Sequence, residues 1–275
     1  MSGNLDPKVV DDFGNEWDQY DQSSFENGFQ EAFSQYFSLF PDHYLNKDSV
    51  GFDAGCGSGR WARYIAPKVK KLYLLDPSEK ALNVAKRNLS NNGNCIFECC
   101  SINDSSINPE SMDFGYCLGV LHHLPDTKSA LKSCISKLKN GAPFLLYIYY
   151  KFDNKPFWFK HIWKCSDLLR SLICILPFKI KLFITQLIAL IVYYPLSRFA
   201  LILDLLGFDI SNIPLSDYRN KPFYFMTTDS LDRFGTRLEK RFTKIEISMM
   251  MKECGLSSIE FSSSAPYWVA IGYKR

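Results

Sequence analysis

The stretch FDAGCGSGR, residues 52–60, decides the fold. The apolar run SVGFDAG, which begins at Ser49, predicts a buried strand, and a helix-forming segment begins at Gly59. Glycine lets the backbone turn sharply between two such elements and lets a ligand approach the main chain closely. The free N–H groups at the start of the following helix favour an anionic group. The stretch therefore predicts a ligand-binding turn between a first strand and a first helix.

Beyond this turn, apolar runs alternate with amphipathic segments as far as Lys151. We expect further strands at residues 71–76, 95–102, 112–120 and 142–150, and helices at 77–89 and from Asp126 to Asn140-Gly141. The pattern resumes with a helix that begins at the capping box of Thr243 and Glu246, followed by strands at 258–264 and 267–275. Such alternation requires parallel strands joined by crossover helices. The predicted fold is therefore α/β and doubly wound, with about seven mostly parallel strands and an antiparallel, hairpin-like pair at the end.

Residues 152–241 do not follow the alternation. They hold apolar, aromatic-rich segments that are broken by Pro156, Pro177, Pro195, Pro214 and Pro222. We interpret them as a mostly helical insertion after the fifth strand. Its most apolar part, residues 182–196, is shorter than the roughly 20 residues that cross a bilayer, and we expect Pro195 to interrupt it.

Composition excludes several classes of function. The formal net charge is only +3 and no long basic run occurs, so nothing favours nucleic-acid binding. The nine cysteines lack the spacing of a disulfide framework, which indicates reduced thiols in a cytoplasm. There is no C-x-x-C, and the four histidines are not at metal-ligand spacing, so we expect no metal site. The N-terminal segment is polar and acidic, unlike a signal sequence.

Two residues narrow the choice of ligand. The dinucleotide fingerprint G-x-G-x-x-G would need glycine at position 60, where the chain has Arg60. The second strand ends in Asp76, at the spacing expected for a carboxylate that accepts the two hydroxyls of a ribose. The alternative is that Asp76 only caps the next helix and the glycines only make a turn.

Three motifs together resemble those of class I S-adenosylmethionine (SAM)-dependent methyltransferases. They are D-x-G-x-G-x-G from Asp53 to Gly59, LLDPS around Asp76, and MDFGYCLGVLHHLPD from Met112 to Asp126. They are most similar to the small-molecule branch that includes quinone-biosynthesis methyltransferases. The resemblance covers about residues 49–151 and 242–275. It implies a Rossmann-like fold, SAM as cofactor and S-adenosyl-L-homocysteine as product.

The resemblance also implies a set of cofactor-binding residues: Asp53, Gly55, Gly57, Gly59, Asp76, Ser101, Ile102 and Leu118. Ser101 and Ile102 depart from the family, which usually has an acidic residue followed by a small one near the adenine. A hydroxyl or a backbone N–H can still serve the adenine edge. Leu118 and Gly119 would lie near the adenosine and the reacting methyl.

His122 and His123 are the candidate catalytic residues. A histidine of near-neutral pKa is a natural general base for an acceptor hydroxyl. Methyl transfer from a sulfonium is an in-line displacement, however, so positioning alone can suffice and the pair can equally belong to the scaffold. Before the first strand, Trp17 and Tyr20 either close over the cofactor or pack as ordinary core aromatics.

The sequence thus predicts three parts: an N-terminal helical cap (1–48), a SAM-binding domain (49–151 and 242–275) and an insertion that shapes the acceptor site (152–241). Aromatic-dense segments at Lys155 and Lys221 suit an apolar or flat acceptor, although the insertion also needs its own core. The arginines 219, 233, 237 and 241 either contact the acceptor or lie on a solvated helix with pairs such as Asp229 and Arg233.

The predicted function is transfer of the sulfonium methyl to a small, partly apolar acceptor by in-line displacement, in the cytoplasm. One alternative is a SAM-binding interaction or membrane-associated protein without turnover. A nicotinamide-dependent oxidoreductase is a further reading, which Arg60 weakens. The expected partner is a small-molecule acceptor and not a nucleic acid. Peripheral membrane contact, or a homodimer through the apolar insertion, also remains open.

Overall fold

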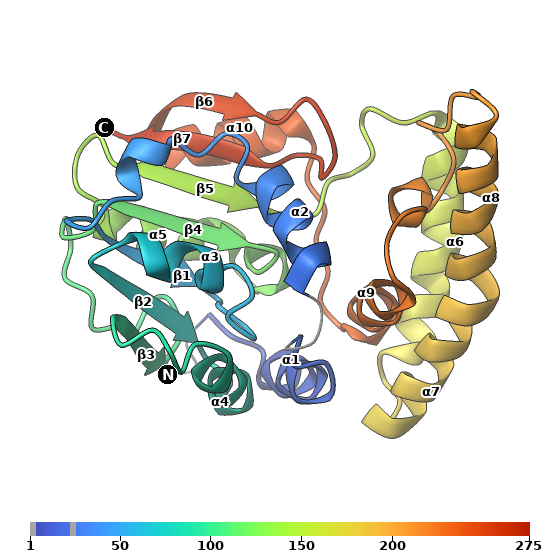
Figure 1. Ribbon diagram of the computed structural model, residues 1–275, viewed down its shortest axis with the longest axis horizontal. Coiled ribbons are helices and arrows are strands. Elements are labelled where there is room, and N and C mark those ends of the chain that lie inside the picture. Colours follow the sequence, from blue (N-terminus) through green and yellow to red (C-terminus); the bar gives the residue numbers. More distant parts are fainter. Residues whose placement is uncertain (1–3, 23–25) are drawn as a thin grey trace. The chain divides into compact units, whose positions relative to one another are not determined.

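The computed structural model describes residues 4–22 and 26–275, which form two compact units (Figure 1). The first unit consists of residues 1–150 and 238–275, and the second of residues 151–237. The first unit contains the sheet and the glycine-rich turn, and the second contains four of the longer helices.

The first unit is built on a sheet of seven strands in the order β3-β2-β1-β4-β5-β7-β6. The strands are β1 (Val50–Ala54), β2 (Lys71–Asp76), β3 (Cys95–Cys99), β4 (Phe114–Leu118), β5 (Pro143–Tyr147), β6 (Leu256–Phe261) and β7 (Ala270–Lys274). Strands β1 to β5 are parallel, and β7 runs antiparallel to both β5 and β6. The predicted doubly wound, mostly parallel sheet with an antiparallel final pair is confirmed. The strand order reverses between β1 and β4, which is where ligands bind in sheets of this kind.

Helices cover both faces of this sheet. They are α1 (Pro7–Gln19), α2 (Glu26–Tyr36), α3 (Ala62–Ile65), α4 (Glu79–Asn88), α5 (Thr127–Lys137) and α10 (Lys244–Glu253), with short 3₁₀ turns η1 (Asp42–Tyr44), η2 (Ala66–Lys68) and η3 (Leu121–His123). The predicted caps are present: the Asp126 side chain accepts from Ser129 N–H, and Thr243 and Glu246 form the capping box. One core cluster joins α5 and α10 to the sheet, and another joins α3 and α4 to it.

Adjacent β1 and β4 pack through two reciprocal glycine–phenylalanine pairs. Gly51 is in register with Phe114, and Phe52 is in register with Gly115. A Cβ atom on Gly51 would lie 2.1 Å from Phe114 Cζ, and one on Gly115 would lie 2.3 Å from Phe52 Cε1. Each ring therefore occupies the space that a side chain would need on the neighbouring strand.

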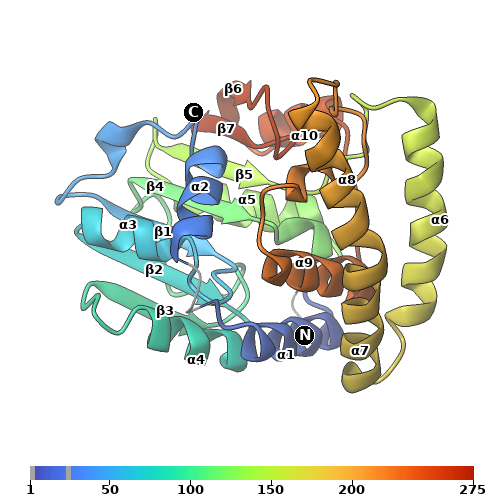
Figure 2. The ribbon, with the colours of Figure 1, turned by 45° about the vertical axis from the view of Figure 1, so that its right-hand side comes forward.

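The second unit is helical, as predicted for an insertion after the fifth strand (Figure 2). Its elements are α6 (Phe157–Ile173), α7 (Phe178–Ile188), the π-helical turn η4 (Ala189–Tyr193), α8 (Tyr194–Leu205), the 3₁₀ turn η5 (Ser216–Tyr218) and α9 (Phe223–Gly235). A small core holds these helices together, formed by Ile173, Ala189, Tyr193, Met226 and Phe234.

The expectation that Pro195 interrupts the apolar stretch is wrong. Residues Phe178–Leu205 form one continuous helix of 28 residues, which by length and composition alone could cross a membrane. Pro195 has no N–H to donate and would disrupt a regular α-helix. Here it stands in the first turn of α8, directly after the π-helical turn, where the change of hydrogen-bond register accommodates it.

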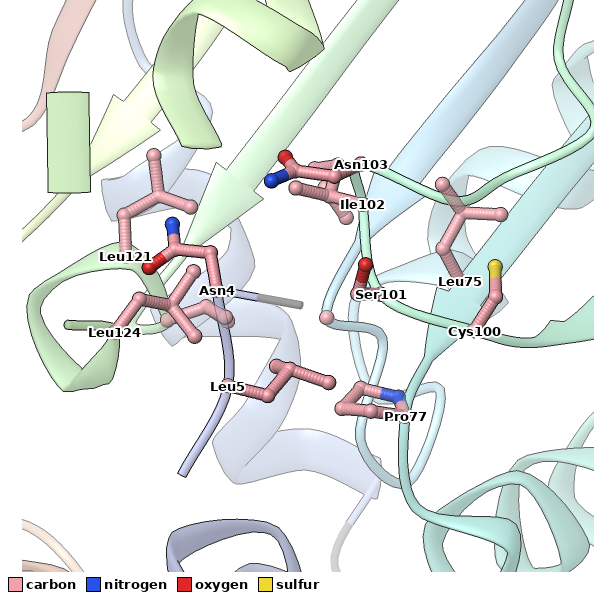
Figure 3. A pocket seen from close by; sticks show the side chains of 13 residues that line it. Asn4, Leu5, Leu75, Pro77, Cys100, Ser101, Ile102, Asn103, Leu121 and Leu124 are labelled. Carbon is pink, nitrogen blue, oxygen red and sulfur yellow. The ribbon is translucent and has the colours of Figure 1, made fainter. Parts of the chain in front are cut away.

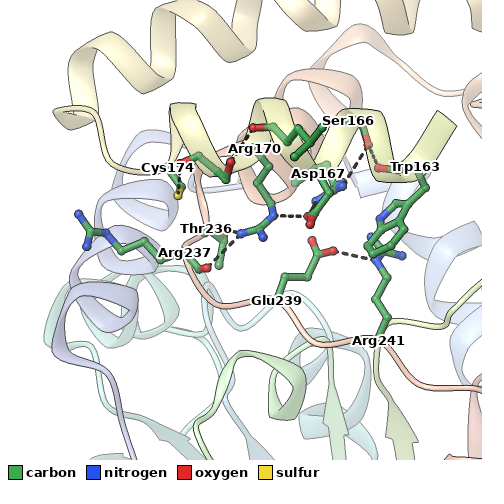
Figure 4. Close-up of polar contacts among 12 residues, drawn as sticks. Trp163, Ser166, Asp167, Arg170, Cys174, Thr236, Arg237, Glu239 and Arg241 are labelled. Carbon is green, nitrogen blue, oxygen red and sulfur yellow. Dashed lines mark hydrogen bonds and ion pairs between the residues drawn. The ribbon is translucent and has the colours of Figure 1, made fainter. Parts of the chain in front are cut away.

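A polar network within the second unit corrects another expectation (Figure 4). Arg233 does not pair with Asp229; its Nη1 lies 3.5 Å from Asp167 Oδ1. The same oxygen also accepts from Arg170 Nε at 2.7 Å, as Figure 4 shows. Asp229 instead accepts the Tyr218 hydroxyl at 2.7 Å. Arg233 of α9 therefore forms an ion pair with α6, because Asp229, one turn away on its own helix, accepts from Tyr218.

Candidate functional site

The glycine-rich turn between β1 and α3 has a backbone that requires glycine. Gly55, Gly57 and Gly59 all have positive φ, at 79°, 53° and 76°. A Cβ on Gly55 would lie 2.5 Å from Val120 Cγ2, and one on Gly57 would lie 2.9 Å from the Trp17 ring. The N–H groups of Gly55 and Cys56 donate to Leu75 O, which ties the turn to the end of β2. The turn is therefore held close to the loop after β4 and to the N-terminal segment.

Asp76 ends β2 and holds the turn by its side chain. Its Oδ2 accepts the Gly57 N–H and its Oδ1 accepts the Ser78 N–H, both at 2.9 Å. The cap of α4 is Ser78 and not Asp76, because the Ser78 hydroxyl accepts from the helix. Burial raises the pKa of Asp76 to about 6, against the effect of the two N–H donors. The carboxylate keeps further lone pairs for a ligand, since each oxygen accepts only one of these two bonds.

Asp53 lies one strand away and is fully buried. Its Oδ2 has no hydrogen-bond partner among the residues that the structure describes. Burial raises the pKa of Asp53 to about 8; the nearby Tyr116 hydroxyl opposes this, and Asp76 adds to it. Such an acid is costly to ionise in the folded protein without a cationic neighbour.

We expect Asp53→Asn to stabilise the fold, and more so at pH 8 than at pH 5. The folded pKa of about 8 lies above the unfolded value of 3.8, so the stabilisation by protonated Asp53 is complete below pH 4 and is lost as pH rises through 8. The neutral amide does not undergo this loss, and its stabilising effect relative to Asp53 should grow by about 4 kcal/mol between the two pH values. Thermal unfolding at both pH values measures it. Asp48→Asn, at an exposed carboxylate, is the control, and equal effects of Asp53→Asn at both pH values would contradict the prediction.

A pocket opens beside the turn at the carboxyl ends of the first four strands (Figure 3). It is lined by Asn4, Leu5, Ala54, Gly55, Leu75, Pro77, Cys100, Ser101, Ile102, Asn103, Val120, Leu121 and Leu124. Of the predicted cofactor residues, Gly55, Ser101 and Ile102 are here. Leu118 lies instead in the core cluster beside α3 and α4. The lining is mostly apolar, as suits a flat heterocycle, and the Ser101 hydroxyl donates to Asp104 Oδ2 at 2.5 Å.

The N-terminal segment contributes one wall of this pocket through Asn4 and Leu5, two residues that no motif in the sequence marks. Leu5 lies across the pocket from Ser101 (Figure 3). Asn4 is anchored by two bonds to the Asp126 backbone: its Nδ2 donates to the carbonyl, and its Oδ1 accepts the N–H at 2.6 Å. Farther along, the Trp17 ring covers Gly57 and lies 5.3 Å from the Arg60 guanidinium. Only the aromatic Trp17 gave a signal in the sequence; nothing distinguishes Asn4 and Leu5 from an ordinary terminus.

His122 and His123 are both buried at the end of β4. The His122 ring stacks on Tyr149 with centroids 3.9 Å apart. Burial, with His123 and Arg241 nearby, lowers the pKa of His122 well below its ordinary value. His123 Nδ1 lies 2.6 Å from Leu238 O, so it carries the proton and donates it. His122 is therefore neutral at physiological pH and a weak base, and the catalytic role of the pair stays a prediction.

An aromatic cluster continues from these histidines along the end of β5. Tyr147 lies 5.0 Å from Tyr36 and 6.0 Å from Tyr149, between ring centroids. Arg241 stacks on Tyr149 at 5.0 Å and pairs with Glu239 at 2.7 Å (Figure 4). The sequence signal was the period of two in LLYIYY, which places Tyr147 and Tyr149 on one face of an extended chain.

The chemistry of this site suits one cofactor. The switch-point turn, the acid at the end of β2 and the apolar pocket after β3 and β4 match the ribose and heterocycle of a nucleoside. A cationic group on the same ligand would favour ionisation of the buried Asp53, whose pKa burial raises to about 8. No group of three His, Cys, Asp or Glu side chains within residues 4–22 and 26–275 could hold a metal ion. The fold and site are those of a Rossmann-like domain suited to binding SAM.

Comparison with known proteins supports this assignment. Residues 52–146 match the family model described as "Methyltransferase domain", so the chain carries such a domain. Ubiquinone biosynthesis O-methyltransferase of Idiomarina loihiensis is 33% identical over 118 residues, which is 37% of this chain and 49% of that protein. The Thiobacillus denitrificans protein of the same name is 34% identical over 92 residues, 33% of this chain and 40% of that one. The chain thus spans at most about half of these relatives.

Solved structures show the same fold at low identity. A SAM-dependent methyltransferase from Thermotoga maritima aligns with a TM-score of 0.52 and 14% identity, over 97% of this chain and 100% of that one. A Haemonchus contortus N-methyltransferase, crystallised with phosphomonomethylethanolamine and S-adenosylhomocysteine, aligns with a TM-score of 0.50 and 14% identity, over 86% of this chain and 39% of that one. At these identities the similarity concerns the fold alone.

Proposed function

We propose that this chain transfers the sulfonium methyl of SAM to a small, partly apolar acceptor by in-line displacement. The observation that carries the proposal is the glycine turn bound to Asp76 beside an apolar pocket at the switch point of the sheet. SAM supplies an electrophilic methyl on a cationic sulfur. The protein therefore needs to bind, orient and exclude water more than to form bonds of its own.

Each part of the site has a role in this proposal. Asp76 accepts the ribose hydroxyls, and Ser101 and Ile102 contact the adenine edge. Gly55, Gly57 and Gly59 let the backbone approach the ligand, and Asp53 faces its positive charge. The segment 1–48 acts as a cap, with Trp17 closing over the turn. Leu118 acts by supporting the β4 end from the core.

The acceptor side is formed by the tyrosine cluster at the end of β5. Tyr36, Tyr147 and Tyr149 offer flat apolar faces and hydroxyls, as an aromatic acceptor would require. His122 is neutral and so can orient an acceptor hydroxyl without competing for its proton. The relatives are named for O-methylation in ubiquinone biosynthesis, which makes apolar hydroxylated compounds the first acceptors to test. In this proposal the enzyme works in the cytoplasm.

The alternative of a SAM-binding protein without turnover is not favoured. A protein that only binds SAM would retain the cofactor residues. It would not need His122 or the tyrosine cluster at the end of β5. A nicotinamide-dependent oxidoreductase has still less support, because residues 52–146 match a methyltransferase domain.

Calorimetric titration of the purified chain tests the cofactor. We expect micromolar binding of SAM and S-adenosylhomocysteine and none of NADH, with a rise in Tm when either SAM-type ligand is added. A screen of hydroxylated aromatic compounds with methyl-labelled SAM then tests turnover. A folded chain that binds neither SAM-type ligand would overturn the proposal. Binding without methylation of any acceptor would favour the protein without turnover.

A further inference from the structure

Large apolar side chains are exposed along the helices of the second unit. Of the 23 exposed large hydrophobic residues that the structure describes, 21 lie between Phe157 and Phe223. The other two are Ile245 and Met249. An apolar surface of this extent marks an interaction site, because soluble proteins rarely expose contiguous patches beyond a few hundred Å².

The continuous helix Phe178–Leu205 has two different faces. Its buried face carries small or polar residues at helical spacing: Lys181, Thr185, Ala189, Tyr193, Ser197 and Ala200. This face packs against α9, where Ser230 Oγ donates to Thr185 O and Lys181 Nζ donates to Gly235 O. The opposite face, which we call the exposed α7–α8 face, carries Ile180, Phe183, Leu187, Leu190, Ile191 and Tyr194. These residues include no Lys, Arg, His, Asp or Glu.

Charge indicates what covers this face. Between residues 168 and 203 the chain has four basic residues and no acidic one. The whole unit, residues 151–237, has 12 Lys and Arg against seven Asp and no Glu. Lys160, Lys164 and Lys179 are exposed beside the apolar side chains of α6 and α7. A basic, apolar surface complements an anionic bilayer. It does not complement itself, since a two-fold contact would bring the same lysines together.

The packing indicates that the helix lies on a bilayer and does not cross it. Only residues 182–197 are free of charge, and sixteen helical residues span about 24 Å against a hydrocarbon thickness of about 30 Å. Crossing would also place α9, with Asp229, Asp232 and Arg233, in the hydrocarbon, because α9 packs along the helix. One apolar face and one protein-covered face is the arrangement of an interfacial helix.

We propose that the exposed α7–α8 face, with Lys179 beside it, binds an anionic lipid surface, and that the exposed lysines of α6 contribute to the same attraction. This inference does not depend on methyl transfer, since it rests on residues outside the cofactor site. It gives the protein a place at the membrane surface, where apolar small molecules concentrate.

Flotation of the full chain with vesicles tests the proposal. We expect binding to phosphatidylcholine vesicles that contain 30% phosphatidylglycerol, and at least tenfold weaker binding to pure phosphatidylcholine. Binding to the anionic vesicles should fall as salt rises. No binding to either vesicle, or equal binding to both, would overturn the proposal.

Matched variants locate the surface. Phe183→Ser and Ile191→Ser, 61% and 66% exposed, should each weaken vesicle binding about tenfold or more. Ile245→Ser, 71% exposed in the first unit, should not change it. Lys160→Gln, Lys164→Gln and Lys179→Gln should each weaken it about fivefold, whereas the exposed Lys86→Gln and Lys252→Gln should not.

Two further readouts separate the competing outcomes. SAM affinity of every variant should equal that of the wild type, which shows that the cofactor site is intact and keeps a failure here distinct from a failure of the proposed function. Analytical ultracentrifugation without vesicles tests whether a second copy of this chain covers the face instead. A dimer that Phe183→Ser dissociates would assign the face to a partner chain and overturn the lipid assignment.

Discussion

Asp76→Ala should weaken the binding of SAM and of S-adenosylhomocysteine about 100-fold or more. The variant loses a carboxylate that would accept two ribose hydroxyls, and charge-assisted bonds of this kind contribute about 1.5 to 3 kcal/mol each. It also frees the Gly57 N–H, which Asp76 Oδ2 accepts at 2.9 Å, so the turn loses its anchor to β2. Calorimetry measures the affinity, and the Tm of the free variant shows whether it is folded.

Asp113→Ala is the matched control for this variant. Asp113 also accepts a backbone N–H, from Val50 at 2.8 Å. It lies at the amino ends of β1 and β4, away from the pocket at their carboxyl ends. The variant should lose stability and keep SAM affinity. In the wild type, affinity should also decline below about pH 6, where Asp76 takes up a proton and becomes a poorer acceptor. If a folded Asp76→Ala variant binds SAM as tightly as the wild type does, another group and not Asp76 binds the ribose.

The sequence predicted those parts of the molecule that depend on local pattern. Alternating apolar runs and crossover helices require a parallel sheet, and the caps at Asp126 and Thr243 follow from hydrogen bonds within one turn. The positions of Asp76 and of the glycine turn could be predicted because Asp76 ends β2 and the turn comes directly after β1. A chain that leaves a strand in a tight turn can adopt few backbone conformations. Such features need no knowledge of distant residues.

Features that depend on residues far apart in the chain could not be predicted from the sequence. Leu5 reaches the pocket because Asn4 bonds to Asp126, 122 residues away. Arg233 pairs with Asp167 of α6 and not with the nearer Asp229, because Tyr218 donates to that carboxylate. Pro195 fits inside a helix because the π-helical turn before it changes the hydrogen-bond register. In each case a tertiary contact or a local irregularity overrides the pattern along the chain.

Gly51→Ala should be the most destabilising single change in the sheet that adds only one methyl group. The new Cβ would lie 2.1 to 2.4 Å from three atoms of the Phe114 ring, at the centre of the sheet, where hydrogen bonds to neighbouring strands on both sides make any movement of β1 or β4 costly. Overpacking of this kind costs about 3 kcal/mol or more, which lowers Tm by roughly 10 °C in a chain of this size. Gly93→Ala is the control, because nothing lies within 4 Å of its Cβ position, and it should be nearly neutral.

The Phe114 ring, which occupies the space of a Cβ on Gly51, allows a test of whether the clash causes the lost stability. Phe114→Leu alone should cost about 1 kcal/mol by leaving a cavity, yet together with Gly51→Ala it should restore most of the lost stability. Additive effects of the two changes, measured by denaturant unfolding, would contradict the steric explanation. The same contact sets the distance between β1 and β4, whose carboxyl ends carry Gly55 and Val120 on facing sides of the cofactor pocket. If Gly51→Ala folds, it should therefore also bind SAM more weakly, because the strands that space the pocket are forced apart.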